Sequence, residues 1–303
     1  REFNAPLFYQ TAKHTAQWAI QEMLDNNTNL FFTGMASDQA HTGASPFYEW
    51  SRGEIPSSAL NIFDIHNTGR STGGLILKRE NNDSLAVSER RVSAIQNALK
   101  SIQPKDESLK PIKDSSIYAD VNGQVISSLF IIGTILNDNE ILETAKTAWE
   151  SARNTFVLSL GDVLHAVEGR ARTTSYLGDY LWLARAGIEC YKATNNKAAL
   201  HIAERIMMRV TELFEHSAGG YITSLFSEYE FAPFVLTNRN FSDDKTESLN
   251  SLAIRNFKDL SVMLNNDEYR IKALQTATAF AESLKEVGLF GAGYARAIYQ
   301  LLN

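Results

Sequence analysis

Cysteine and proline are scarce in this chain, which has one cysteine and six prolines among 303 residues. A single cysteine excludes an intrachain disulfide, and because Cys190 has helix-forming neighbours we expect a buried structural thiol. Lysine and arginine form no cluster and the formal net charge is −6, which argues against nucleic acid and membranes as partners. No apolar run reaches the roughly 20 residues that cross a bilayer, since serine, glycine and threonine interrupt the longest candidate, residues 125–136.

Motifs for metal, phosphate and nucleophile chemistry are also missing. The six histidines form no His-x-x-x-His pair, residues 291–293 lack the partners of a phosphate-binding glycine loop, and no serine lies in a nucleophile elbow. We therefore expect no metal and no cofactor. Because there is no signal-peptide pattern, we expect a cytoplasmic location, although a start at Arg1 without methionine is compatible with removal of an earlier segment.

What the sequence does contain is a helical hairpin repeated three times. Each copy has an apolar helix, an asparagine-rich turn and an amphipathic helix with an alanine eight residues after the first asparagine. The turns begin at Asn137, Asn195 and Asn265, and the alanines are Ala145, Ala203 and Ala273. The hairpins are expected at residues 119–157, 174–215 and 248–286, with a further helix at 292–302.

The distribution of charge within each hairpin predicts which helix is central. The first helix of each pair is apolar nearly all round, as at residues 119–136, and the second carries charge on one side. The sequence therefore predicts an all-α fold, an (α/α) toroid of helical hairpins, complete or incomplete, with short β-hairpins in its loops. We expect residues 1–303 to form one domain, with an irregular aromatic loop insertion at residues 30–83.

The N-terminal turns of the three inner helices are unusually polar, and connectivity places them on one face of the toroid. If they ring a funnel, two carboxylates could act there as acid and base, with Asp120 and Asp179 as the catalytic candidates. Helix capping is the competing interpretation, above all for Asp120 and Ser248. The other candidate ligand-binding residues on these turns are Asn122, Tyr176, Tyr180, Glu247 and Asn250.

Two loop segments add candidates. Tyr48 and Trp50 could form a stacking wall for a sugar, or a small satellite core under a long loop. His165, Arg170 and Arg172 precede the second inner helix, where the arginines could bind an anion or make solvated salt bridges. Glu168, in the same loop, is a further candidate acid.

Five segments resemble the helical region of the YyaL-type proteins, which pair a thioredoxin-like domain with an (α/α)6 toroid. They are Tyr9-Gln10-Thr11-Ala12, Phe47-Tyr48-Glu49-Trp50, Asn122-Gly123, Leu177-Gly178-Asp179-Tyr180 and Ser248-Leu249-Asn250-Ser251. Val121 stands where the family has tryptophan, and Glu247 where it has proline. Since the thioredoxin-like domain is missing, the resemblance implies either a fragment or a shortened member.

The resemblance implies a fold akin to N-acylglucosamine 2-epimerases and six-hairpin glycosidases, and a sugar-like ligand, but it names no reaction. We therefore compare three hypotheses. The first is a toroid that binds or modifies a small polar ligand such as a sugar. The second is a non-catalytic scaffold that binds a protein, such as a redox partner, or a second copy of itself. The third is an epimerase or isomerase with His165 as the base.

Overall fold

The computed structural model describes residues 6–35, 53, 55, 57, 64–67, 75–78, 97, 112–166, 176–225, 239–244 and 246–303. Contacts divide the chain into two compact units, one made of residues 1–33 and 116–303 and the other of residues 34–115. The first unit contains the helices α1 (Pro6–Met23), α4 (Ala119–Leu136), α5 (Asn139–Phe156), α6 (Leu177–Thr194), α7 (Lys197–Phe214), α8 (Leu249–Leu264), α9 (Asp267–Ala279), α10 (Leu284–Val287), η3 (Gly288–Gly291) and α11 (Ala292–Leu302).

The asparagine-rich turns join the helices of each hairpin by one recurring geometry. Asn137, Asn195 and Asn265 end the inner helices in the left-handed conformation, with φ of 53°, 59° and 50°. Asparagine tolerates this conformation better than most residues. The residue that follows each of them caps the next helix with its side chain, as Asp138 does by accepting from the N–H of Ile141 at 3.3 Å. Two residues therefore suffice to reverse the chain.

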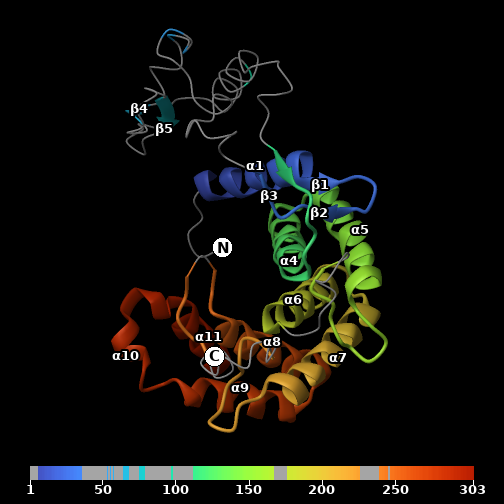
Figure 1. Ribbon diagram of the computed structural model, residues 1–303, viewed down its shortest axis with the longest axis vertical. Coiled ribbons are helices and arrows are strands. Elements are labelled where there is room, and N and C mark those ends of the chain that lie inside the picture. Colours follow the sequence, from blue (N-terminus) through green and yellow to red (C-terminus); the bar gives the residue numbers. More distant parts are fainter. Residues whose placement is uncertain are drawn as a thin grey trace, which may run out of the picture. The chain divides into compact units, whose positions relative to one another are not determined.

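The three hairpins pack side by side with their first helices toward the centre (Figure 1). Helix α4 packs against α6, α6 against α8 and α8 against α11, while α5, α7 and α9 each cover the inner helix that precedes them. The repeated alanines Ala145, Ala203 and Ala273 are fully buried on these outer helices. Helix α4 is long and apolar enough to span a membrane, and its contacts with α1, α5 and α6 place part of its apolar surface in the core.

Two glycines allow neighbouring helices to approach closely. A Cβ on Gly123 of α4 would lie 2.5 Å from the backbone carbon of Trp182 in α6. A Cβ on Gly187 of α6 would lie 2.9 Å from the carbonyl oxygen of Ala199 in α7. A methyl group fits at neither position, so glycine sets the spacing of α4, α6 and α7.

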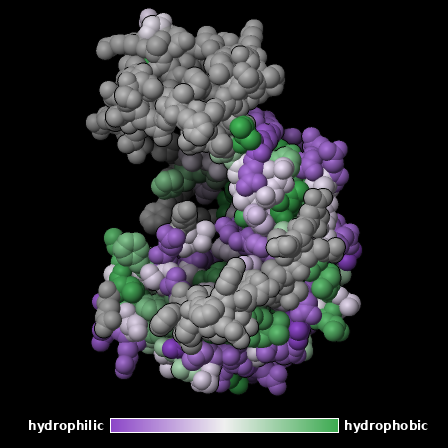
Figure 2. Space-filling model, viewed as in Figure 1, coloured by the Kyte–Doolittle hydropathy of each residue, from purple (hydrophilic) through white to green (hydrophobic). Residues whose placement is uncertain are grey.

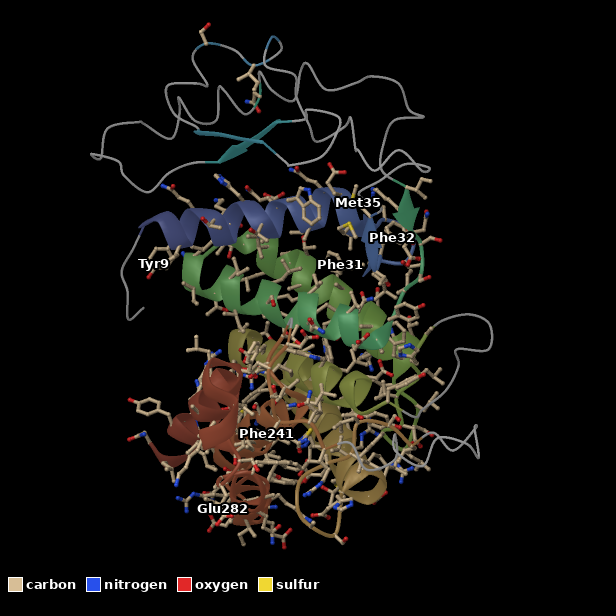
Figure 3. The ribbon with its side chains drawn as sticks, turned by 60° about the vertical axis from the view of Figure 1, so that its left-hand side comes forward. Tyr9, Phe31, Phe32, Met35, Phe241 and Glu282 are labelled. Atoms are coloured by element: carbon tan, nitrogen blue, oxygen red, sulfur yellow. The ribbon has the colours of Figure 1, made fainter. Side chains whose placement is uncertain are left out.

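The third outer helix is shorter than predicted. It ends at Ala279 rather than near residue 286 because Phe280 leaves the helix. Its ring stacks on Phe241 at 5.1 Å between centroids and meets the edge of Tyr294 at 6.1 Å. Phe241 lies between the last helices of the chain (Figure 3). A short helix, α10, and the 3-10 turn η3 then lead to α11.

Each of α1, α5 and α7 is followed by a short antiparallel hairpin. Strand β1 (Leu24–Asp25) pairs with β2 (Leu30–Phe31), Val157 pairs with Val163, and Glu215 pairs with Tyr221. The predicted β-hairpins in the loops are thus present. Phe31 is fully buried beneath α1 (Figure 3), where β2 contacts α4 and α5.

The second unit contains two antiparallel strand pairs among its described residues. Strand β3 (Gly34–Met35) pairs with β6 (Lys113–Asp114), and β4 (Asp64–Asn67) pairs with β5 (Leu75–Lys78). In the chain, this unit is inserted between the first short hairpin and α4. Residues 167–175 and 226–247 hold the corresponding positions in the sequence, before α6 and α8.

Candidate functional site

The N-terminal ends of three inner helices meet at Gly178. A Cβ on Gly178, in the first turn of α6, would lie 3.8 Å from Cβ of Asp120 in α4 and 3.8 Å from Leu249 in α8. The polar first turns therefore share one end of the first unit, as the sequence predicts. The free N–H groups and positive dipole ends of helices at such a place favour polar or anionic ligands.

His165 and Asp179 form the most strongly connected pair at this end. Nδ1 of His165 lies 3.1 Å from Oδ1 and 3.0 Å from Oδ2 of Asp179. The side chain of Asp179 is 1% exposed and that of His165 is 24% exposed, so the carboxylate lies behind the ring. Oδ1 of Asp179 also accepts from the backbone N–H of Asp120 at 3.2 Å. Asp179 thus joins α6 to the start of α4 while it orients His165.

The backbone fixes His165 from the other side. Its carbonyl accepts from the N–H of Ala119, the first residue of α4, at 2.9 Å, and Tyr118 forms a β-bridge with Ala166. Two tyrosine rings flank the imidazole. The Tyr118 ring stacks on it at 4.7 Å between centroids and 18° between planes, and the Tyr176 ring meets it at 4.6 Å and 52°. These contacts leave the imidazole little freedom to rotate.

Electrostatics favours a protonated His165. The hydrogen bond with Asp179 and the negative charges of Asp179 and Asp120 raise the pKa of His165 above its ordinary 6.5, against the opposing effect of burial. Burial raises the pKa of the Asp179 carboxyl, and His165 limits that rise. If Nδ1 donates to Asp179, Nε2 is the ring nitrogen that can exchange a proton with a ligand.

Asp120, His165 and Asp179 could each offer one ligand atom to a metal ion, since these atoms lie within 4.8 Å of one another. The direct hydrogen bond between His165 and Asp179 already satisfies Nδ1 and both carboxylate oxygens. Asp120 also bonds within its own helix, where Oδ1 accepts from the N–H of Val121 at 2.8 Å. These three side chains therefore fit an organic ligand that bonds to Nε2 of His165 as readily as they fit a metal ion.

Three predicted ligand-binding residues instead support the short hairpins. Asn122 accepts from the N–H of Phe31 at 2.7 Å and donates to its carbonyl at 3.1 Å, and Asn250 makes the same pair of bonds to Tyr221 at 2.8 and 3.1 Å. The Tyr180 hydroxyl donates to Asp162 at 3.4 Å. All three residues are fully buried, so their placement supports a structural role rather than ligand contact.

Glu247 lies just before the N-cap of α8 and forms an ion pair with Arg255 of the same helix. Next to it, Arg185 of α6 donates to Asp259 at 2.8 Å and also pairs with Glu189. Sequence reasoning identified Glu247 but neither arginine, since an arginine on an apolar helix gives no sign of its partner.

The remaining predicted site residues lie outside the described part of the chain. They are Tyr48, Trp50, Glu168, Arg170 and Arg172. Sequence reasoning also missed Tyr118. The sequence could have predicted it, because Tyr118 and Tyr176 occupy equivalent positions. Each lies immediately before an inner helix whose first turn contains an aspartate.

The comparisons with known proteins are limited in extent. No family model matches the chain. Over 213 residues it is 25% identical to human Spermatogenesis-associated protein 20, and the alignment covers 65% of this chain. The chain spans only 27% of the length of that relative.

Two of the solved structures that this chain resembles are carbohydrate-active enzymes. An α-mannanase of glycoside hydrolase family 76 from Bacteroides thetaiotaomicron is 14% identical, with 70% of this chain and 63% of that chain covered at a TM-score of 0.52. An unsaturated glucuronyl hydrolase from Bacillus sp. GL1 is also 14% identical, with 59% and 49% covered at a TM-score of 0.45. At these identities the likeness concerns the fold alone. The likeness to the α-mannanase, together with the observed helical hairpins, confirms the predicted (α/α) toroid fold.

Proposed function

We propose that the chain binds a carbohydrate-like polar ligand at the N-terminal ends of α4, α6 and α8, with His165 as the central contact. The observation that carries this proposal is the His165–Asp179 pair, a partly exposed imidazole oriented by a buried carboxylate. The flanking rings of Tyr118 and Tyr176 add amphipathic surface of the kind that sugars contact. The fold shared with carbohydrate-active enzymes supports the same ligand class.

Within this proposal, the roles of the two predicted catalytic acids differ. Asp179 is buried behind the imidazole, so we assign it the positioning of His165 rather than direct contact with a ligand. Asp120 is half-buried and lies at the same helix ends, where it could accept hydrogen bonds from hydroxyl groups. The likeness to Spermatogenesis-associated protein 20 supports our further proposal that the chain is a YyaL-type helical region.

The test is a binding screen by isothermal titration calorimetry with mannotriose, cellotriose and glucuronate. We expect at least one saccharide to bind, and His165→Gln to weaken that binding by about tenfold or more, the loss of one charge-assisted hydrogen bond. His201→Gln is the matched control, because His201 is exposed on outer helix α7. Absence of binding across the panel, or equal binding by His165→Gln, would refute the proposal.

If the chain is an enzyme, we propose that it transfers a proton at a sugar carbon. The His165–Asp179 pair favours this reaction over a mechanism with two carboxylates. An epimerase or isomerase of this kind would exchange a carbon-bound hydrogen of its substrate with solvent. Incubation of reducing sugars with the chain in deuterated water, followed by NMR of the sugar, would detect such exchange. We expect it to be lost in His165→Gln and retained in His201→Gln.

A second candidate function is a scaffold that binds another protein. Large apolar side chains are exposed near the last helix: Leu289 is 92% exposed and Phe290 is 65% exposed. Figure 2 shows apolar residues at the surface beside α10. An exposed apolar patch often marks an interaction site. Light scattering decides between the two candidate functions. Association of the chain that is lost in Phe290→Ser would favour the scaffold. A monomer that binds a saccharide would count against it.

A further inference from the structure

Glu247 and Arg255 form an ion pair through only one oxygen and one nitrogen. Nη1 of Arg255 donates to Oε1 of Glu247. Arg255 lies in the second turn of α8, and its side chain extends back toward the start of the helix, as helical side chains do. Arg255 is 9% exposed, and the side chain of Glu247 is 15% exposed. The pair is therefore largely removed from water.

The two atoms beside this contact have unused hydrogen-bonding capacity. Oε2 of Glu247 and Nε of Arg255 are buried, and neither has a partner within the described part of the chain. A bidentate arginine–carboxylate pair would use two nitrogens and both oxygens. Here one charged acceptor and one charged donor remain unsatisfied, which is costly for buried groups and uncommon unless a water or ligand bonds to them.

The neighbouring charges cannot satisfy these two atoms. Arg185 of α6, whose charge acts on Arg255, is itself bonded to Asp259 and Glu189. It repels Arg255, and this repulsion adds to burial in lowering the pKa of the Arg255 guanidinium. Among the described residues, Glu247 is thus the carboxylate that forms an ion pair with Arg255 and stabilises its charge. The unsatisfied donor and the unsatisfied acceptor therefore belong to the two partners of one buried ion pair.

We propose that Glu247 and Arg255 together bind one hydroxyl group of the ligand. The hydroxyl oxygen accepts from Nε–H of Arg255, and the hydroxyl hydrogen is donated to Oε2 of Glu247. A hydroxyl is both donor and acceptor, so it completes the pair without adding charge. The inference rests on the proposed function, because Leu249, two residues after Glu247, lies beside Gly178 at the same helix ends as Asp120. It names the group held there as a hydroxyl, and so the ligand class as a polyhydroxylated molecule.

The test is a double-mutant cycle on binding of mannotriose, cellotriose and glucuronate. Arg255→Lys keeps the charge but removes Nε, and Glu247→Gln keeps the shape but removes the charged acceptor. Each should weaken saccharide binding by about tenfold, the worth of one hydrogen bond to a charged group. The double variant should also lose about tenfold rather than about a hundredfold, since both residues hold the same hydroxyl. Arg205→Lys and Glu143→Gln, both exposed, are the matched controls.

The outcomes separate this inference from the proposed function. If the unmodified chain binds a saccharide and both variants bind it equally well, the pair holds a bound water only, and the inference fails while the proposed function stands. A hundredfold loss in the double variant also overturns it, because two independent contacts would then be involved. Absence of binding by the unmodified chain overturns both. Circular dichroism confirms that each variant folds, and if Arg255→Lys does not, Glu247→Gln alone must show the loss.

Discussion

The carboxylate of Asp179 lies 3.0 Å from Nδ1 of His165 and also accepts the backbone N–H of Asp120. One buried group thus connects the start of α4, the loop before α6 and α6 itself. Because this contact orients the one imidazole at the inner-helix ends among the described residues, the site depends on the packing of two hairpins rather than on a local motif.

The protonation of His165 should depend on Asp179. In Asp179→Asn the negative partner is lost, so the pKa of His165 should fall toward or below its ordinary 6.5. NMR titration of the imidazole Cε1 proton measures this directly. His201, exposed on α7, provides an internal reference signal in the same spectra. An unchanged His165 pKa would mean that the carboxylate does not control the imidazole.

The same contact makes the stability of the chain depend on pH. Because the folded-state pKa of His165 is raised, its contribution to the free energy of unfolding is fully present below about pH 6.5 and is lost as pH rises through the folded-state pKa. We expect urea denaturation to show that the free energy of unfolding of the unmodified chain falls from about pH 6 to about pH 9. The fall should be smaller in His165→Gln. Parallel curves for the two proteins would contradict this expectation.

Asn122 should be essential for stability. Asn122→Ala leaves the N–H and carbonyl of buried Phe31 without partners, so we expect a loss of about 2–4 kcal/mol in the free energy of unfolding. Asn154→Ala, at an exposed position of α5, should change it by less than about 0.5 kcal/mol. Urea denaturation compares the two, and equal stabilities would show that the asparagine does not support the hairpin.

Two glycines of the inner helices should respond differently to alanine. Gly123→Ala places a methyl group against the backbone of Trp182 and should cost about 1–3 kcal/mol. Gly178→Ala meets its nearest atoms at an ordinary 3.8 Å and should be neutral or stabilise by up to about 1 kcal/mol. Thermal denaturation ranks the two variants, and a reversed order would contradict the close contact of α4 with α6.

Much of the helical architecture could be predicted because it is encoded locally. Asn137 and Asp138 specify by themselves the end of one helix and the start of the next, so the bounds of α4 and α5 follow from the sequence. The end of α9 was missed because it depends on the contact of Phe280 with Phe241, nearly forty residues away. Helix propensity, which depends on the local sequence, does not predict a contact between residues so far apart in the chain.

For the candidate site, the sequence indicated which residues to consider better than it indicated which hydrogen bonds they make. The polarity of the first helical turns identified Asp120 and Asp179, but nothing in the spacing of His165 and Asp179 indicates a hydrogen bond across a loop. Asn122 and Asn250 show a second way in which sequence pattern and contacts differ. A polar residue near a helix start suggests a ligand contact, whereas here each satisfies the backbone of a short hairpin packed against the helix.

The most direct measurement is the response of the His165 imidazole to a saccharide, followed by NMR of the ring nitrogens during titration with mannotriose, cellotriose or glucuronate. We expect the Nε2 resonance of His165 to shift saturably while that of His201 stays fixed, with the shift reduced in Asp179→Asn. A His165 resonance that remains unchanged at every saccharide concentration would contradict a carbohydrate-binding site at the ends of α4, α6 and α8.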